Sequence, residues 1–227
     1  GIQYDTIIND WHTSKNTDRI YASNPCSEYM FLNDSACNLA SLNLMRFRKE
    51  VNGEMIFDVE AFKKANEVII TAMEIIVGKS VYPTPAIEQN SFDYRPLGIG
   101  YANLGALLMS RGLAYDADEG RNLAGAISSL QSGHCYYQSA KIAEKVGPFA
   151  GYKMNEEPCL QVMRMHRDEA YKINETGIPA DLLTESRKAW DNTVEHGSKF
   201  GLRNAQISVI APTGTISFLM DCDTTGV

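Results

Sequence analysis

The sequence predicts an α/β fold with parallel strands, and three kinds of segment predict it. Residues 38–44 (NLASLNL) alternate polar and apolar side chains with the two-residue period of a half-buried strand. Residues 206–210 (QISVI) also have strand composition, and residues 95–100 (RPLGIG) predict a short buried strand or a turn. Segments with helical periodicity separate these candidate strands. Strands that alternate with helices are typical of a parallel sheet covered by helices.

The first third of the chain combines loops, one strand and one helix. Residues 1–22 are polar and mixed, and a short strand is predicted at their end, before the stretch SNPCSE at 23–28. Residues 29–47 are loop-like outside the strand at 38–44, and residues 51–54 (VNGE) predict a turn. A helix follows with Asp58 as its N-cap and Gly78 at its end. Its predicted buried side consists of Val59, Phe62, Ile69, Met73 and Ile76.

The remaining two thirds predict four more helices before the strand at 206–210. Pro83 and Pro85 predict a break, and an apolar helix is expected over 102–109. Asp116 or Asp118 is the expected N-cap of a long helix that runs to about residue 145, where Gly147-Pro148 stops it. Two more helices are predicted over 155–171 and 181–196.

Composition and charge exclude several classes of protein. The chain has 227 residues and a net charge of −7, which argues against a nucleic-acid polymer or an anionic membrane as its main partner. No apolar run approaches the ~20 residues of a membrane span, and no secretory signal is visible. The five cysteines are irregularly spaced without a CxxC pair, so they predict neither a metal site nor a disulfide framework. We therefore expect a cytoplasmic protein with reduced thiols. Because the chain starts at Gly1 without an initiator Met, we also expect a piece of something longer.

The first chemical candidate is the stretch Asn24-Pro25-Cys26-Ser27-Glu28. Pro25 favours an extended backbone, in which residues two apart point to the same side, so the side chains of Asn24, Cys26 and Glu28 would share one face. An amide, a thiol and a general base could together handle a carbon that carries a hydroxyl group. The alternative is a loop with a small buried cysteine and a solvated glutamate.

Cys37 is the second candidate, because it follows Cys26 closely where a polar loop enters the strand at 38–44. It is either a core residue or a redox partner in the same pocket. The scattered histidines and the acidic pairs 156–157 and 168–169 are interpreted as structural or exposed residues.

The third candidate is the stretch APTGTIS at 211–217. Pro212 and Gly214 would shape a tight turn whose amides can hold a phosphate, and Thr213, Thr215 and Ser217 add hydroxyl donors. The alternative is a plain strand-to-helix turn. The stretch lacks the Gly-Lys-Ser/Thr ending of a Walker loop. Gly98 and Gly100 lack the third glycine of a dinucleotide fingerprint and are interpreted as close helix–strand packing.

Taken together, these motifs resemble the ribonucleotide reductase family. The family's Asn-x-Cys-x-Glu finger-loop motif corresponds to Asn24, Cys26 and Glu28. The wider stretches NPCSEYMFLNDSACNLASLNL, RPLGIGYANLGALLM and APTGTIS resemble its class II branch, which depends on adenosylcobalamin (vitamin B12). The spacing from Cys26 to Cys37 also suits that branch. The resemblance covers essentially the whole chain.

The resemblance implies a partial ten-stranded α/β barrel. Residues 1–50 would form the finger loop and its flanking strands, and residues 51–227 the helices and strands of the second half-barrel. The implied reaction reduces a ribonucleotide, expected to be a diphosphate, to its 2′-deoxy form for DNA synthesis. Substrate would contact residues 24–28 and Pro212, Thr213, Gly214, Thr215, Ile216 and Ser217.

The resemblance also implies a role for each finger-loop side chain. A thiyl radical at Cys26 would take the 3′-hydrogen of the ribose, Glu28 would accept the 3′-hydroxyl proton, and Asn24 would orient the hydroxyls. Cys37 would form a disulfide with a cysteine in a missing upstream segment. The implied partners are the missing N-terminal and C-terminal portions and a thioredoxin-like or dithiol reductant. The isolated piece would then be inactive.

Two other functions remain open from the sequence. One is a class I-type subunit whose radical comes from a partner that carries a metal. The other is a non-catalytic nucleotide-binding half of a split reductase. A thiol hydrolase is a more distant alternative, because no histidine lies near Cys26 in the sequence.

Overall fold

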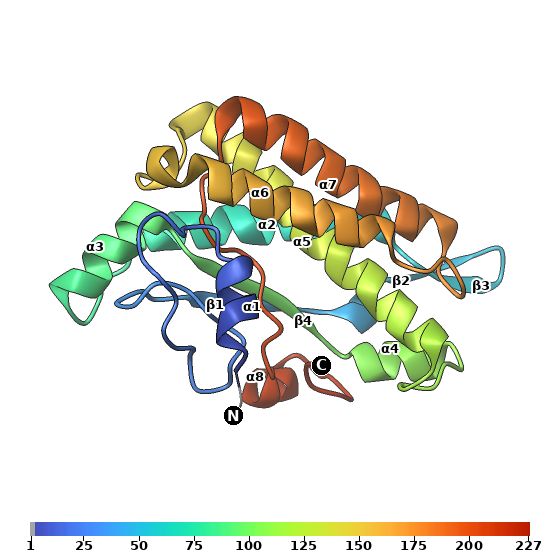
Figure 1. The fold of residues 1–227 in the computed structure, drawn as a ribbon. Coiled ribbons are helices and arrows are strands. Elements are labelled where there is room, and N and C mark those ends of the chain that lie inside the picture. The colour runs from blue at the N-terminus through green and yellow to red at the C-terminus, as the bar shows by residue number, and fades with distance from the viewer. Residues whose placement is uncertain (1–2) are drawn as a thin grey trace.

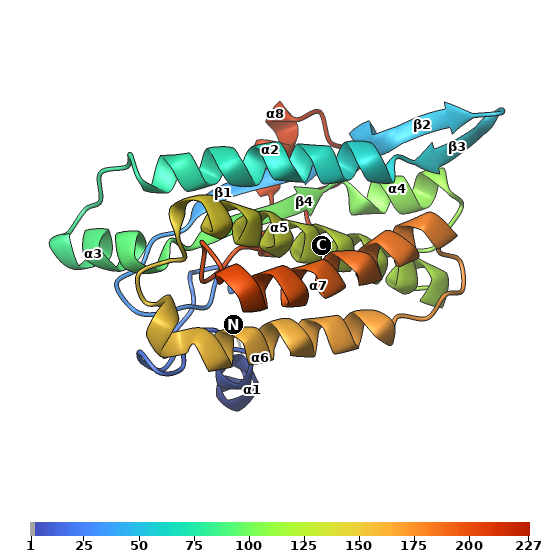
Figure 2. The same cartoon turned by 90° about the horizontal axis from the view of Figure 1, so that it is seen from above.

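The computed structural model describes residues 3–227 and shows a mixed α/β fold. Residues 1–2, the start of the predicted polar segment, lie outside the described residues. The long helices α2 (Val59–Val77), α5 (Asp118–Val146), α6 (Tyr152–Tyr171) and α7 (Ala180–Phe200) lie on one side of the strands (Figure 1). Seen from above, these helices lie side by side in the order α2, α5, α7, α6 (Figure 2).

The central strands are parallel, as predicted. Strand β1 (Asn38–Asn43) pairs in parallel with β4 (Leu97–Ala102), with Asn38 opposite Leu97 and Asn43 opposite Ala102. Residues 206–209 follow the other edge of β4, where Ile99 N donates to Ile207 O at 2.9 Å and Val209 N donates to Ile99 O at 2.9 Å. A Cβ on Gly100 would lie 2.7 Å from Val209 O, so this close approach requires glycine.

The predicted strand at 206–210 is therefore only partly right. The segment makes a single parallel bridge, Ile99 to Ser208, and forms no regular strand. Within residues 3–227 the strands form two two-stranded sheets, and no closed barrel is present in this part of the chain. The α/β class is thus confirmed, and the ten-stranded barrel stays a prediction.

Helix α2 closely matches the helix predicted from the sequence. Asp58 Oδ1 accepts the N–H of Ala61 at 3.1 Å and caps the helix, and Gly78 ends it. Val59, Phe62 and Met73 are buried as predicted, and Ile69 is half-buried. Ile76 is 49% exposed, so its placement on the buried side was wrong. Ile70 and Val77 take the buried positions instead, because the turn of the helix brings them to the inner face.

Several elements differ from the sequence prediction. The polar start of the chain contains a short helix, α1 (Asp5–Asp10), and only a bridge between Ser23 and Met30 stands where a strand was expected. The turn at 51–54 joins a hairpin of β2 (Arg48–Val51) and β3 (Glu54–Phe57), which follows the 3₁₀ helix η1 (Leu44–Phe47).

Helix α3 (Pro85–Tyr94) lies where Pro83 and Pro85 predicted a break. Pro85 occupies the first turn, where its missing N–H costs nothing, and Thr84 Oγ1 accepts the N–H of Ile87 at 3.2 Å. The prolines thus begin a helix as well as ending the previous segment.

The long helices begin and end near their predicted limits. α5 starts at Asp118 without a side-chain cap, so the capping roles given to Asp116 and Asp118 were wrong. α6 begins at Tyr152 rather than 155 and contains Pro158, and α7 runs on to Phe200. The apolar helix after β4 is α4 (Leu104–Ser110), and the last helix is α8 (Gly214–Leu219).

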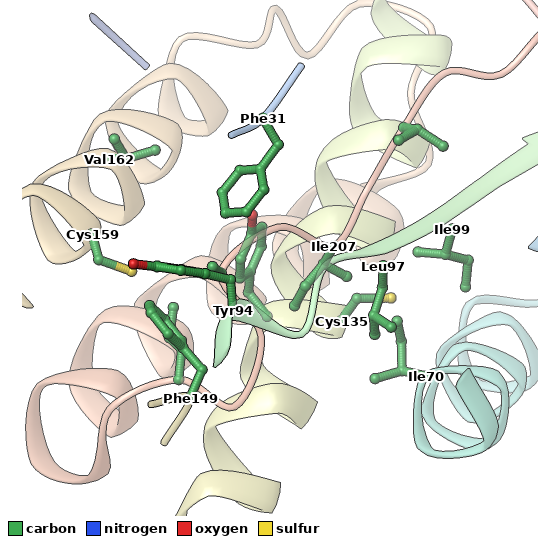
Figure 3. Packing of buried hydrophobic residues seen from close by; sticks show 14 of the residues in the cluster. Phe31, Ile70, Tyr94, Leu97, Ile99, Cys135, Phe149, Cys159, Val162 and Ile207 are labelled. Carbon is green, nitrogen blue, oxygen red and sulfur yellow. The ribbon is translucent and has the colours of Figure 1, made fainter. Parts of the chain in front are cut away.

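The core lies between the helices and the strands. Figure 3 shows apolar side chains from β4, α2, α5 and α6 meeting there, among them Leu97, Ile70, Cys135 and Cys159. Both cysteines are fully buried, and burial raises the pKa of each thiol, that of Cys159 to about 12. They are structural residues, as expected. No helix in the described part of the chain is both long enough and apolar enough to span a bilayer.

A buried charge cluster fixes the start of the segment that leads to residues 206–217. Glu74 Oε1 on α2 accepts from Arg95 Nε at 2.6 Å and from Arg203 Nε at 2.6 Å. Its Oε2 accepts from Asn204 Nδ2 at 2.7 Å. Because Glu74 and Arg95 are almost fully buried, the cluster holds α2, the beginning of β4 and residues 203–204 in fixed relative positions.

Candidate active site

The stretch at 24–28 forms a tight turn and not an extended segment. Ser27 N donates to the carbonyl oxygen of Asn24 at 3.1 Å, which closes a four-residue turn with Pro25 and Cys26 at its centre. Pro25 suits this position because its φ is already fixed, and Ser27 adopts a left-handed backbone with φ 67°. The prediction that Asn24, Cys26 and Glu28 share a face of an extended strand was therefore wrong in its geometry.

The turn nevertheless presents Cys26 and Glu28 to one cavity. Together with Ser27, they line a cavity of about 590 Å³, a volume within the usual range for small-molecule sites. The cavity's other walls come from β4, α5, α6 and the residues just after it, α7 and the segment at 208–210. These walls consist of Tyr101, Gly125, Ser128, Ser129, Gln131, Ser132, His166, Glu169, Ala170, Ile173, Trp190, Ser208, Val209 and Ile210.

Glu28 carries the clearest chemical signal in this cavity. Its Oε2 is shielded from solvent and has no hydrogen-bond partner within residues 3–227. A buried carboxylate oxygen without a donor is costly, so this atom suits a ligand that brings a hydroxyl group. No Lys or Arg of the described chain lines the cavity, which fits a sugar better than a phosphate.

Asn24 lies outside this group of side chains. The side-chain Oδ1 of Asn24 accepts the backbone N–H of Tyr29 at 3.0 Å, and the backbone N–H of Asn24 donates to Tyr29 O at 3.1 Å. These bonds hold the base of the loop and turn its tip toward the cavity. Asn24 is absent from the cavity wall, and within the described residues its side-chain N–H₂ group has no acceptor.

Cys37 lies next to this site at the start of β1. Its thiol donates to Asn38 O at 3.5 Å and faces Gly98, where an added Cβ would be 2.3 Å from the sulfur. Burial, together with the negative charge of Glu28, raises the pKa of Cys37 to about 12. The structure thus brings Cys37 near Glu28 and keeps it as a protonated thiol.

The turn at 211–217 lies beyond the cavity, directly after residues 208–210 that line it. Thr213 has a left-handed backbone with φ 52°, and its Oγ1 donates to Ala211 O at 3.1 Å and lies 3.3 Å from Ser41 Oγ on β1. Ser217 Oγ donates to Gly214 O at 2.6 Å. Among residues 3–227 the amides of Gly214 and Thr215 have no acceptor, and a Cβ on Gly214 would meet open space.

Sequence reasoning missed most of the cavity wall. Ser128, Ser129 and Ser132 lie on one face of α5, and their helical spacing was the available signal. His166 stacks on Trp190 with ring centroids 4.9 Å apart, and burial lowers the pKa of His166 to about 4. Its place in the cavity wall depends on the packing of α6 against α7, which no local pattern reveals.

Comparison with known proteins identifies close relatives. The family model described as "Ribonucleotide reductase, barrel domain" matches residues 1–227. A vitamin B12-dependent ribonucleotide reductase of Rhodopirellula baltica is 53% identical over 227 residues, and one of Streptomyces coelicolor is 52% identical over 228 residues. The matches cover 100% of this chain but only 21% and 24% of those two proteins.

A more distant relative has a different name. The ribonucleoside-diphosphate reductase subunit alpha of Chlamydia pneumoniae is 26% identical over 205 residues, which cover 87% of this chain and 19% of that protein. The chain therefore spans about a fifth to a quarter of the first relatives it matches.

Proposed function

The chain belongs to the ribonucleotide reductase family, and on that basis we propose that it is the finger-loop part of a catalytic barrel that converts ribonucleotides to 2′-deoxyribonucleotides. The observation that carries the proposal is the shared cavity of Cys26 and Glu28, with an unpartnered carboxylate oxygen on Glu28. A thiol and a base that face one sugar are what the reaction requires.

We assign the chain to a ten-stranded α/β barrel, with residues 1–50 as finger loop and flanking strands and 51–227 as part of the second half. The parallel pair β1–β4, extended by residues 206–209, supports this assignment. The other edge of β1 has no strand partner within the described residues, so it is open to a further strand from the rest of the enzyme.

The likeness to the vitamin B12-dependent relatives supports adenosylcobalamin as the cofactor. When bound, this cofactor supplies a carbon-centred radical that can take a hydrogen atom from a thiol. Cys26 fits such a transfer because it is exposed at the cavity. Within residues 3–227 we assign the cavity to the sugar of the nucleotide and assign no residue to the corrin ring.

Each finger-loop residue then has a defined task. The sulfur of Cys26, as a thiyl, takes the 3′-hydrogen of the ribose and returns it to C3′ once C2′ has been reduced. Glu28 Oε2 accepts the proton of the 3′-hydroxyl. Removal of that proton eases the loss of water from C2′. Asn24 holds the turn in shape through its two bonds to Tyr29 and thereby orients Cys26 and Glu28 toward the sugar.

Cys37 supplies the reducing equivalents in this proposal. It and a second thiol outside this chain are oxidised to a disulfide, while the C2′ hydroxyl leaves as water and C2′ gains hydrogen. Burial suits Cys37 to this role because a protonated thiol can give a hydrogen atom. A thioredoxin-like protein or a small dithiol would then reduce the disulfide.

We assign the phosphates of the substrate, a nucleoside diphosphate, to the turn at 211–217. The free amides of Gly214 and Thr215 and the hydroxyl of Thr215 can donate to phosphate oxygens. Thr213 and Ser217, whose hydroxyls donate to Ala211 O and Gly214 O, shape the turn together with Pro212 and Ile216. The vitamin B12-dependent names of the most similar relatives favour this class over a class I-type subunit.

The test uses the full-length reductase that contains this chain. With a ribonucleoside diphosphate, adenosylcobalamin and a dithiol, we expect deoxynucleotide formation that Cys26→Ser abolishes while nucleotide binding persists. Reduction that survives Cys26→Ser would overturn the proposal. The isolated chain of residues 1–227 should be inactive, because the partner of Cys37 and the rest of the barrel lie outside it.

A further inference from the structure

Residues 220–226, which we call the tail, fold back over the carboxyl ends of β1 and β4, beside α8 and the turn at 211–214 (Figure 1). Asn103 N donates to Thr225 O at 2.9 Å, and Gly226 N donates to Pro212 O at 2.8 Å. A Cβ on Gly226 would lie 2.2 Å from Ala211 O, so the two backbones are in direct contact. The tail therefore contacts the turn through its backbone.

Asn103 holds this tail in place. It directly follows β4, is 1% exposed and has a left-handed backbone with φ 71°. Its Oδ1 accepts the N–H of Thr224 at 2.9 Å and lies 3.3 Å from the Thr224 hydroxyl. Its Nδ2 donates to Asn43 Oδ1, at the end of β1, at 3.0 Å. A strained, buried asparagine with these partners fixes the tail to both strands.

Thr224 takes over the capping role that Asn103 leaves open. Asn103 stands at the N-cap of α4, yet its side chain makes no capping bond to that helix. The hydroxyl of Thr224 instead accepts the N–H of Ala106 at 3.3 Å. The tail is thereby tied to α4 as well as to β4.

Asn43 adds a second attachment at the start of the tail. Its Nδ2 donates to Met220 O at 3.1 Å, while its Oδ1 also accepts the N–H of Met45 at 3.1 Å. Asn43 is buried, so these bonds are shielded from water. The tail is thus held at residues 220 and 224 by the two strand ends.

The turn at 211–214 is consequently held from two sides. β1 contacts it through Ser41 and Thr213, and the tail contacts it through Gly226 and Pro212. Between these contacts the amides of Gly214 and Thr215 stay free. Fixing the turn from both sides would keep these donors aimed at a ligand without a reorganisation cost.

We propose that Asn103 and Thr224 are positioning residues for the phosphate turn, acting through the tail at 220–226 to set its affinity for the phosphates of the nucleotide. This inference rests on the proposed phosphate role of residues 211–217. It assigns a specific task to residues 220–226, namely to hold Pro212 and thus the free amides after it.

The test compares Thr224→Val with Thr224→Ser in the full-length reductase. Valine keeps the methyl group that packs beside Gly105 and removes the hydroxyl, whereas serine keeps the hydroxyl. We measure binding of a nucleoside diphosphate and, by competition, of the same nucleoside without phosphates. Thr224→Val should weaken diphosphate binding by about 3–10-fold, the effect of one lost hydrogen bond, and leave nucleoside binding unchanged. Thr224→Ser should restore diphosphate binding to within about twofold.

Two outcomes would overturn the proposal. If Thr224→Val weakens the binding of diphosphate and of nucleoside equally, Thr224 has a general structural role. If it leaves the diphosphate affinity unchanged, the tail is not coupled to the turn.

Gly214→Val separates these results from a failure of the phosphate role. Its side chain would enter open space at the turn, so diphosphate binding should fall if the turn binds phosphate. If Gly214→Val has no effect, the phosphate role itself is wrong.

Discussion

At the scale of single residues, Glu28 and Glu169 offer a matched comparison. Both line the cavity, but the Oε2 of Glu28 is buried and unpartnered, whereas Glu169 is exposed and its Oε1 is bonded to Lys172 Nζ at 2.7 Å. A general base must be near the proton that it removes, and it must be free to accept it.

We therefore expect Glu28→Gln to lower the turnover of the full-length enzyme by about 10²–10⁴-fold, and Glu169→Gln to change it little. Steady-state rates with a saturating nucleotide provide the measurement. A similar loss of turnover in the two variants would mean that the enzyme depends on the negative charge of the cavity and not on a base at position 28.

The site residues were predictable from the sequence to different degrees. Cys26, Glu28 and Cys37 were singled out because they fit motifs that the sequence shares with the ribonucleotide reductase family, and their catalytic roles stay predictions. The geometry of the loop was not predicted, because Ser27 adopts a left-handed backbone, whereas the prediction assumed an extended segment. The contributions of His166 and Trp190 depend on the packing of α6 against α7, which lies beyond any local pattern.

At the scale of elements, the packing of β1 against β4 places Cys37. A Cβ on Gly98 would lie 2.3 Å from the Cys37 sulfur and 2.6 Å from Leu39 Cδ2. Gly98→Ala should therefore displace the Cys37 thiol and lower both the thermal midpoint and sustained turnover.

Gly125→Ala is the control for stability, because its Cβ would meet nothing within 4 Å in the interior of α5. It should keep or raise the thermal midpoint of the full-length enzyme, since alanine favours a helix. A Gly98→Ala variant as stable and active as the wild type would contradict the close contact of β1 and β4.

The Glu74 cluster connects α2, β4 and the segment at 203–204. Glu74→Gln would leave Arg95 and Arg203 without their carboxylate, and removal of one partner from a buried ion pair costs about 3–5 kcal/mol. Hydrogen exchange of the β4 amides in the full-length protein measures this loss of stability.

The control is Glu60→Gln, which breaks an exposed pair with Lys63 and should cost less than about 1 kcal/mol. Equal protection in the two variants would refute the role of the cluster.

The elements themselves show where sequence patterns are reliable. Helix α2 was predicted because a cap, a regular period and a stop signal agree, and strand β1 was predicted from its two-residue alternation. Helix α3 was missed because Pro83 and Pro85 were interpreted only as a break, although Pro85 with Thr84 before it is also a helix start. Residues 206–210 were predicted as a strand from composition, but they make only one bridge with β4.

At the scale of the whole molecule, buried histidines make stability depend on pH. Burial lowers the pKa of His12, His134 and His166 from 6.5 to about 4 in each case. Between these values the unfolded chain binds more protons than the folded one, so stability is complete above pH 6.5 and falls as the pH drops toward 4.

Thermal unfolding of the full-length protein at a series of pH values tests this dependence. The midpoint should decrease from pH 7 to pH 4.5, and His166→Phe should make the decrease shallower while it keeps an aromatic ring between Trp11 and Trp190. An unchanged slope in this variant would show that His166 is protonated equally in the folded and unfolded states.

We propose that Cys26 and the sugar of a nucleotide meet in the cavity that Cys26 shares with Glu28. The most direct measurement compares reduction of a ribonucleoside diphosphate that carries deuterium at C3′ with reduction of the unlabelled substrate by the full-length enzyme. We expect the wild type to reduce the deuterated substrate more slowly than the unlabelled one, and Cys26→Ser to reduce neither. Equal rates for both substrates, together with activity that survives Cys26→Ser, would contradict it.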